Sequence, residues 1–497
     1  MIGLSDVHYF PLPSQGNVYS LATVEGVGGV RRLLVASLRR KVFSLELQCL
    51  PGEQCQASVK EVPFTYIPNG AEIIALDAFH TQADDLVVGI TIVKPAVAGR
   101  PTPSQSFLNV YSEWGEAGDS LLDSVAQNCF SLELSFAPYH LFHTPLPASR
   151  EIVWLLSGGD EQIHLFREDK LNHCYQEEPL QPLFPELYEL SCGVVLWIDV
   201  VYSLEQDRRI TALACESGCL LLTQVDVASN TVLSTHTKNY SGPLSSVRLF
   251  TLDNESLDLV VTSTLSPSVV YSNVLKQGLS EFHGLPESGS HDIALCVLLA
   301  DVDMDGRLEI MIGTYGQELL IYKQCECVKE WHLLKRMTLA NPIYSLLYLD
   351  LTADGVNELV ALTLKGVHVM QHNVDQTEKR EDREVERIFK VLEQVAEIKD
   401  YQVDKIKNSS GNQLSILNSN LEVTVGMCES ILEKGEEEES VDVALLVKRE
   451  GRKAEWEAFI RDMGEKCARV DKTFKEREEE LSEYYKQLEQ KLHLTEN

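Results

Sequence analysis

The sequence predicts an all-β seven-bladed β-propeller followed by an α-helical coiled-coil tail. A strand-rich unit recurs over the first three quarters of the chain, and its last three acidic segments begin at Asp253, Asp301 and Asp350, which are 48 and 49 residues apart. After His372 the composition changes abruptly to Glu, Lys, Arg and Gln, with apolar residues at helical spacing. We therefore expect a propeller over residues 1–373, a helical linker and acidic spacer over 374–440, and an amphipathic coiled-coil helix over 441–497.

The repeated unit has an apolar run, an acidic loop, a very apolar strand, a turn and a second strand. Units of 40–50 residues with several short strands are typical of propeller blades, whereas a β-sandwich would not explain the regular spacing. The earlier copies are less regular, so six blades remain an alternative to seven. The N-terminal segment Asp6–Pro11 could supply a strand that closes the ring and removes its free edges. The copies span Val18–Leu47, Ile73–Tyr111, Leu134–Phe166, Val194–Val225, Val247–Tyr271, Ala294–Tyr322 and Ile343–Met370.

The most distinctive local motif is the acidic loop that contains Asp301, Asp303, Asp305 and Glu309. Three carboxylates at alternate positions, Gly306 and a fourth acid supply hard oxygen ligands at the spacing of a calcium loop. The pattern is similar to the FG-GAP loops of integrin-α-type propellers, which join the first two strands of a blade. One interpretation is therefore a structural Ca²⁺ in this loop. The alternative is a turn whose acids accept hydrogen bonds from its own backbone amides and need no metal.

Other blades carry weaker versions of this loop. The copy from Asp350 to Glu358 keeps the framework but replaces the middle acid with Thr352. We also interpret Asp77 and Asp199 as the remaining acids of the same loop in earlier blades.

Catalysis is not predicted. The sequence has no GxSxG motif and no phosphate-binding loop, and His140 and His143 have no Cys or Asp at a useful spacing, so we interpret both as structural histidines. Paired carboxylates around the central channel, as in glycosidase propellers, stay open as an alternative. The net charge of −32 disfavours binding to nucleic acid or to an anionic membrane. No signal peptide and no transmembrane segment is expected, which favours a cytoplasmic protein.

The tail is expected to bind a partner helix. Its apolar stripe is narrow and flanked by charges, so it cannot bury itself alone in water. A single solvated helix held by charge pairs is the alternative. The expected contact residues of this stripe are Trp456, Met463, Val470, Phe474, Leu481 and Leu488.

Six segments occur in order along the propeller region: Ser14–Ala22, Phe64–Pro68, Asp85–Thr91, Leu183–Leu187, Tyr315–Leu320 and Leu364–His368. Together they resemble the kaptin family. This resemblance implies a non-catalytic scaffold subunit of a lysosome-associated nutrient-sensing complex of the KICSTOR type, which restrains the target-of-rapamycin kinase. It implies two protein partners, a second integrin-α-like propeller and a very large scaffold subunit, and recruitment to the lysosomal surface. It also implies an alternative, association with filamentous actin in actin-rich structures.

The tail departs from that family. From about Leu414 onward, and especially over Trp456–Phe459 and Ala468–Asp471, it resembles muted, a coiled-coil subunit of an organelle-biogenesis complex. A natural fusion and a gene annotation that joins two neighbouring genes would both produce this sequence. The tail resemblance implies a third function, a coiled-coil subunit of such a complex.

Overall fold

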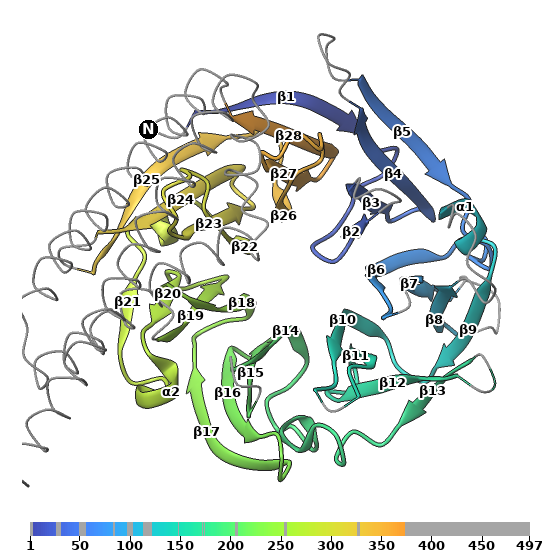
Figure 1. Cartoon of the computed structure of the whole chain (residues 1–497), viewed down its shortest axis with the longest axis horizontal. Helices are drawn as coiled ribbons and strands as arrows, with labels where there is room; N and C mark the ends of the chain where they lie inside the picture. The colour runs from blue at the N-terminus through green and yellow to red at the C-terminus, as the bar shows by residue number, and fades with distance from the viewer. Residues whose placement is uncertain are drawn as a thin grey trace, which may run out of the picture. The chain divides into compact units, whose positions relative to one another are not determined.

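Seven four-stranded antiparallel sheets form a ring in the computed structural model of the chain (Figure 1). The structure describes residues 3–25, 31–48, 56–82, 85–96, 103–112, 122–147, 149–170, 172, 174–203, 207–252, 256–325 and 329–372. Six sheets each use four consecutive strands, and the seventh combines the last three strands with the first. This confirms the prediction of seven blades and excludes six. The predicted helical tail lies outside the described residues.

Blades one to four are built from consecutive strands. Blade one has β2 (Leu21–Glu25), β3 (Arg31–Ser37), β4 (Lys41–Gln48) and β5 (Gln56–Val62). Blade two has β6 (Glu72–His80), β7 (Leu86–Lys94), β8 (Gln105–Ser112) and β9 (Cys129–Leu134), with helix α1 (Leu122–Val125) before β9. Blade three has β10 (Pro138–Pro145), β11 (Ile152–Gly158), β12 (Ile163–Asp169) and β13 (Cys174–Glu178). Blade four follows the short helix η2 (Pro185–Leu187) and has β14 (Val195–Tyr202), β15 (Arg208–Cys215), β16 (Cys219–Asp226) and β17 (Thr231–Asn239).

Blades five to seven complete the ring. Blade five has β18 (Leu244–Thr251), β19 (Leu257–Ser263), β20 (Val269–Tyr271) and β21 (Phe282–Gly284), with helix α2 (Val274–Gln277) before β21 and η3 (Ser288–Ser290) after it. Blade six has β22 (Ala294–Ala300), β23 (Glu309–Thr314), β24 (Glu318–Gln324) and β25 (Trp331–Thr338). Blade seven has β26 (Ile343–Leu349), β27 (Glu358–Thr363), β28 (Gly366–His372) and β1 (Leu4–Pro11).

The ring closes through β1, which is the outermost strand of blade seven. It pairs antiparallel with β28 from Leu4↔His372 to Pro11↔Gly366. This confirms the closing strand expected at Asp6–Pro11. Closure joins the two ends of the propeller and covers the edge that β28 would otherwise leave unpaired (Figure 1).

The apolar core is divided between the blades. Seven clusters of buried hydrophobic residues lie one at each junction between neighbouring blades, and the cluster between blades seven and one includes Phe10 of β1. Second strands are covered by neighbours on both faces, so β19, β23 and β27 are buried along their whole length. The outer strand β17, by contrast, is mostly exposed. This division explains why the second strand of each repeat reads as a continuous apolar run.

The innermost strands share one irregularity. In blades two to seven the register of the first strand shifts near its beginning, as between Ile73 and Ala75 or between Ala294 and Cys296. Such a bulge leaves a backbone amide without a ladder partner, and a hydroxyl on the second strand can accept from it. Ala75 N–H donates to Thr91 Oγ1 at 2.9 Å in blade two. The periodic bulge supports the description of the blades as copies of one unit.

Candidate functional site

The predicted acidic loop of blade six joins β22 to β23, the first two strands of the blade. Asp301 accepts hydrogen bonds from the backbone amides of Asp305 (3.0 Å) and Gly306 (2.6 Å). Gly306 has φ +83° and Met304 has φ +55°, so the loop turns twice through the left-handed region. The first acid of the motif therefore caps the turn with its own side chain.

Glu309 also accepts hydrogen bonds from the backbone of this turn. It is the first residue of β23, and its side chain is fully buried. Its Oε2 accepts from the backbone amides of Val302 (3.0 Å) and Asp303 (3.3 Å). Burial raises the pKa of Glu309 to about 7, although the nearby Lys323 ammonium acts in the opposite direction.

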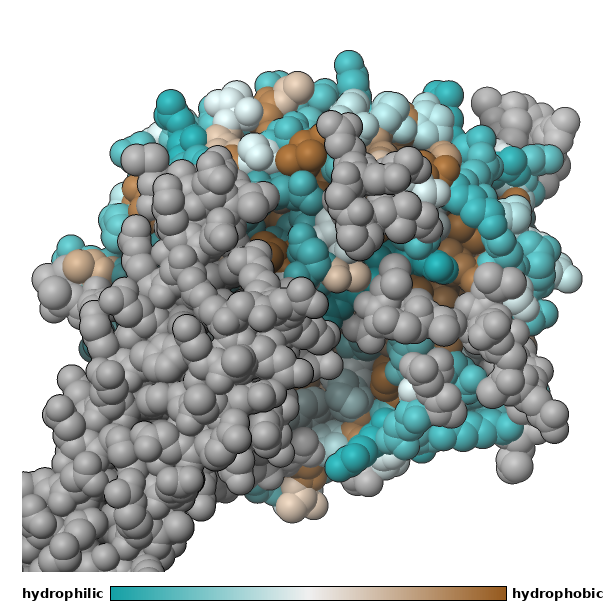
Figure 2. All heavy atoms as spheres, turned by 45° about the horizontal axis from the view of Figure 1, so that its top comes forward, coloured by the Kyte–Doolittle hydropathy of each residue, from teal (hydrophilic) through white to brown (hydrophobic). Residues whose placement is uncertain are grey.

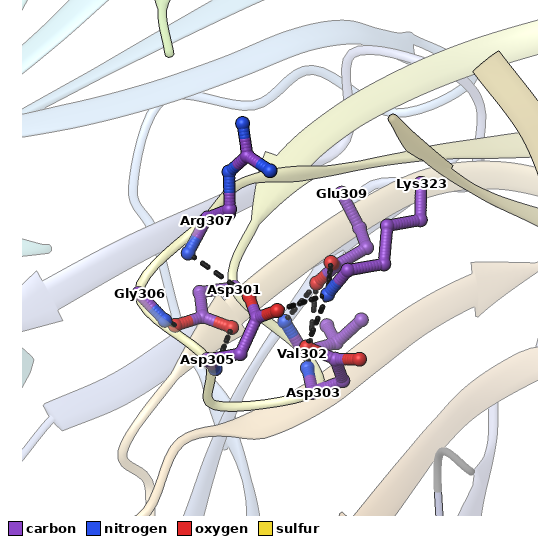
Figure 3. Close-up of polar contacts among 8 residues, drawn as sticks. All are labelled: Asp301, Val302, Asp303, Asp305, Gly306, Arg307, Glu309 and Lys323. Atoms are coloured by element: carbon purple, nitrogen blue, oxygen red, sulfur yellow. Dashed lines mark hydrogen bonds and ion pairs between the residues drawn. The ribbon is translucent and has the colours of Figure 1, made fainter. Parts of the chain in front are cut away.

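A lysine from outside the predicted motif lies among the acids of the loop (Figure 3). Lys323 Nζ, from strand β24, donates to Asp303 Oδ1 at 2.7 Å, Asp305 Oδ2 at 2.6 Å and Glu309 Oε1 at 2.9 Å. Burial alone would lower the pKa of Lys323, but these three hydrogen bonds raise it above its ordinary value. The register of the hairpin, which pairs Ile310 with Tyr322, places Lys323 beside Glu309.

The donor set can be compared with what calcium requires. Asp301, Asp303 and Glu309 each offer an oxygen, and these oxygens lie within 4.8 Å of one another. Calcium needs six to eight oxygen ligands at about 2.3–2.6 Å, and an ammonium group offers none. Asp303, Asp305 and Glu309 already bind the Lys323 ammonium, so the residues present do not fit a calcium ion while that side chain holds its position.

The second acidic loop, in blade seven, repeats the turn but lacks both the middle acid and the lysine. Gly355 N–H donates to Asp350 Oδ2 at 2.8 Å, and Leu351 N–H donates to Glu358 Oε2 at 2.8 Å. The other oxygen of Glu358 accepts from the Thr352 hydroxyl (3.0 Å) and from the Gln371 side-chain amide (3.2 Å). This loop is thus held by neutral donors.

Asp77 and Asp199, two further acids predicted in such loops, lie within strands instead. Asp77 is inside β6 and Asp199 is inside β14, so the sequence interpretation was wrong for both. Each joins two blades: Asp77 Oδ2 accepts from His143 N–H (3.1 Å) and Asp199 Oδ2 accepts from Leu249 N–H (2.7 Å). The reason is that an Asp after an apolar run can either end the strand or continue it into a contact with the next blade.

The centre of the ring is crossed by an aromatic cluster. Tyr19, which precedes β2 of blade one, donates its hydroxyl hydrogen to Leu196 O in blade four at 2.7 Å. His140 stacks on Trp197 with ring centroids 4.6 Å apart, and its Nδ1 accepts from Ile198 N–H at 3.1 Å. Burial lowers the pKa of His140 to about 3, so this ring stays neutral and serves as an acceptor.

The second histidine is paired rather than free. Burial alone would lower the pKa of His143, but Asp77, 2.7 Å from its Nδ1, raises it. Asp199 has an Arg248 guanidinium at 3.2 Å. Thus Asp77, His143 and Asp199 all take part in contacts between blades, which fits the interpretation of His140 and His143 as structural residues.

One part of the prediction lies outside the described residues. The coiled-coil stripe at Trp456, Met463, Val470, Phe474, Leu481 and Leu488 lies beyond residue 372, where the description ends. Within the described ranges, no helix is long and apolar enough to cross a membrane. On the face in Figure 2, hydrophilic and hydrophobic residues of the propeller are interspersed.

Comparison with known proteins relates the two parts of the chain to different families. Residues 4–381 match the family model described as KICSTOR complex protein kaptin, and residues 372–492 match the model described as Organelle biogenesis, Muted-like protein. The chain is 39% identical over 380 residues to the KICSTOR complex protein kaptin of Mus musculus, covering 73% of this chain and 86% of the mouse protein.

Two crystal structures of BBS1N in complex with ARL6DN, soaked with mercury and with lead, are 12% and 13% identical to this chain. Their TM-scores are 0.48 and 0.46, and they cover 75% and 74% of this chain and 97% and 96% of the solved chains.

Proposed function

The chain belongs to the kaptin family, and on that premise we propose that it is a non-catalytic scaffold subunit of a complex of the KICSTOR type. The family membership carries this proposal. We further propose that the complex is recruited to the lysosomal surface and restrains the target-of-rapamycin kinase when nutrients are low. The partners proposed for the propeller are a second integrin-α-like propeller and a very large scaffold subunit.

The geometry is consistent with a role in assembly. A propeller closed by β1 presents a rigid ring with two faces and an outer rim, which suits binding to several proteins at once. Carboxylates that could have formed a catalytic pair in the channel are engaged between blades, as Asp77 is with His143 and Asp199 with Arg248. The rings of Tyr19, which precedes β2 of blade one, and Trp197 of blade four also connect different blades, with ring centroids 6.1 Å apart.

The test is recovery of partners from cells. The full chain, tagged and expressed in nutrient-starved cells, should recover the second propeller and the very large subunit under mild lysis. A clean failure to recover both would contradict the proposal. The matched variant is the chain ending at residue 372, which keeps every described strand and should recover the same two proteins. Co-sedimentation of the full chain with filamentous actin at physiological salt tests the alternative.

A second function is proposed for residues 372–492, because this segment matches the Muted-like family. We propose that it binds a partner helix independently of the propeller. Proteins recovered by the full chain, but not by the chain ending at residue 372, would be its partners. If both chains recover the same set, this second function is contradicted.

A further inference from the structure

We propose that Lys323 is a built-in counter-ion that takes the place of calcium in the acidic loop of blade six, and that removing its ammonium group converts this loop into a calcium site. The proposal concerns the propeller itself and does not depend on which proteins the chain binds. It follows from three observations, the position of the ammonium, its burial and the composition of the corresponding loop in blade seven.

The ammonium lies where a bound cation would lie. Its nitrogen is 2.6–2.9 Å from one oxygen each of Asp303, Asp305 and Glu309. A calcium ion bound by the same oxygens would sit at about 2.3–2.6 Å from each and would overlap the ammonium group. Figure 3 shows the ammonium group among these carboxylates. The two cations therefore exclude each other.

Lys323 is also held in place. Its side chain is only 17% exposed, although lysine side chains commonly extend into water. The three hydrogen bonds use all three donors of the ammonium group. For calcium to enter, the ammonium group would have to lose these three hydrogen bonds. The lysine is part of the chain, so it neutralises the acids at any calcium concentration.

Blade seven supplies an internal comparison. Pairing of Ile310 with Tyr322 in blade six corresponds to pairing of Leu359 with Met370 in blade seven, so Gln371 occupies the position of Lys323. In the loop itself, Thr352 occupies the position of Asp303.

The same loop therefore exists in two versions within one chain. One version has the middle acid and the lysine, and the other has neither. If a metal ion from solution neutralised the blade-six acids, the lysine would not be needed. The matched loss of both charges indicates that the lysine is the partner of the acid.

The experiment measures the melting temperature of the full chain with a calcium chelator and with millimolar CaCl₂, together with calorimetric titration with CaCl₂. The variants are Lys323→Gln, which copies one residue of blade seven, and the double variant Asp303→Thr with Lys323→Gln, which copies both. Lys276→Gln, at an exposed lysine of α2, is the matched control.

The wild type and the control should melt at the same temperature in chelator and in calcium. Lys323→Gln should melt about 5 °C lower in chelator, because buried acids lose their counter-ion, and calcium should restore most of this loss. It should also gain one calorimetric calcium site over wild type. The double variant should lose this calcium response. If Lys323→Gln does not fold in chelator, it should fold when CaCl₂ is added, and a failure to fold in calcium while the double variant folds would contradict the proposal.

Two results would overturn the proposal. One is a wild-type protein whose melting temperature rises by several degrees with calcium, in a manner abolished by Asp303→Asn. The other is a folded Lys323→Gln protein that binds no more calcium than wild type.

Discussion

The link between blades three and four is held by a buried ion pair whose removal has a calculable cost. Arg209 binds Glu186 of η2 through two hydrogen bonds, Nε to Oε1 at 2.7 Å and one terminal nitrogen to Oε2 at 2.8 Å. The side chains are 3% and 0% exposed, and the guanidinium lies 4.5 Å from the ring centroid of Phe184. Thr211 donates to the same carboxylate at 3.1 Å.

Arg209→Met keeps most of the side-chain volume but leaves the Glu186 carboxylate buried without its counter-charge. We expect a loss of about 3–5 kcal/mol in the free energy of unfolding, because an uncompensated buried charge is costly. This is a large part of the roughly 5–15 kcal/mol that stabilises a folded domain. The double variant Arg209→Met with Glu186→Leu should recover most of the loss, since it removes both charges.

Urea denaturation followed by tryptophan fluorescence measures the change, read from the midpoint at constant slope. Arg208→Met is the matched control, because Arg208 is the next residue, is 49% exposed and is 3.8 Å from Asp207. It should cost less than about 1 kcal/mol. The reasoning is refuted if Arg209→Met costs no more than the control, or if the double variant is less stable than Arg209→Met alone.

Three further predictions concern the channel, an acidic loop and the closure of the ring. Tyr19→Phe removes the donor to Leu196 O and should cost about 1–2 kcal/mol in chemical denaturation. Burial raises the pKa of Glu358 from 4.5 to about 7, so its stabilising contribution is fully present below pH 4.5 and is lost as the pH rises through 7. The free energy of unfolding of Glu358→Gln should therefore rise by up to about 3 kcal/mol relative to wild type between pH 5 and 8.5. The melting temperatures of both proteins, recorded against pH, follow this change. Gly366→Ala places a Cβ in steric conflict with Phe10 O and should loosen β1, which limited proteolysis of the N-terminus would detect.

Each of these predictions has its own control. Tyr66→Phe changes a tyrosine that is 71% exposed and should leave stability unchanged. A stability difference between Glu358→Gln and wild type that stays constant across the pH range would contradict the assigned pKa. Gly284→Ala adds a Cβ that meets no atom within 4 Å, so its N-terminus should resist proteolysis as wild type does. Equal cleavage of both glycine variants would contradict the closure argument.

The repeated architecture was accessible from the sequence because it is local and periodic. Each blade pairs strands that are neighbours in the chain, and the apolar run of each second strand marks it as covered on both faces. The closing strand β1 was also predicted, because a ring of repeats leaves one edge that a terminal segment can fill. The turn at Asp301 was recognisable from three acids and Gly306 alone.

What the sequence did not reveal depends on contacts between distant residues. The hydrogen bond from Tyr19 to Leu196 O joins positions 177 residues apart, and no periodicity marks it. Asp77 and Asp199 could not be distinguished from loop acids without the strand register. Lys323 lies outside the acidic-loop motif, because it belongs to strand β24 of the adjoining hairpin.

The most direct test of the scaffold function is reconstitution of the complex from purified subunits. The full chain is mixed with a second integrin-α-like propeller and the very large scaffold subunit, and the mass of the product is measured by light scattering during gel filtration. The account predicts one species that contains all three proteins in fixed stoichiometry. Separate elution of a folded chain from the other two, at micromolar concentrations of each, would contradict it.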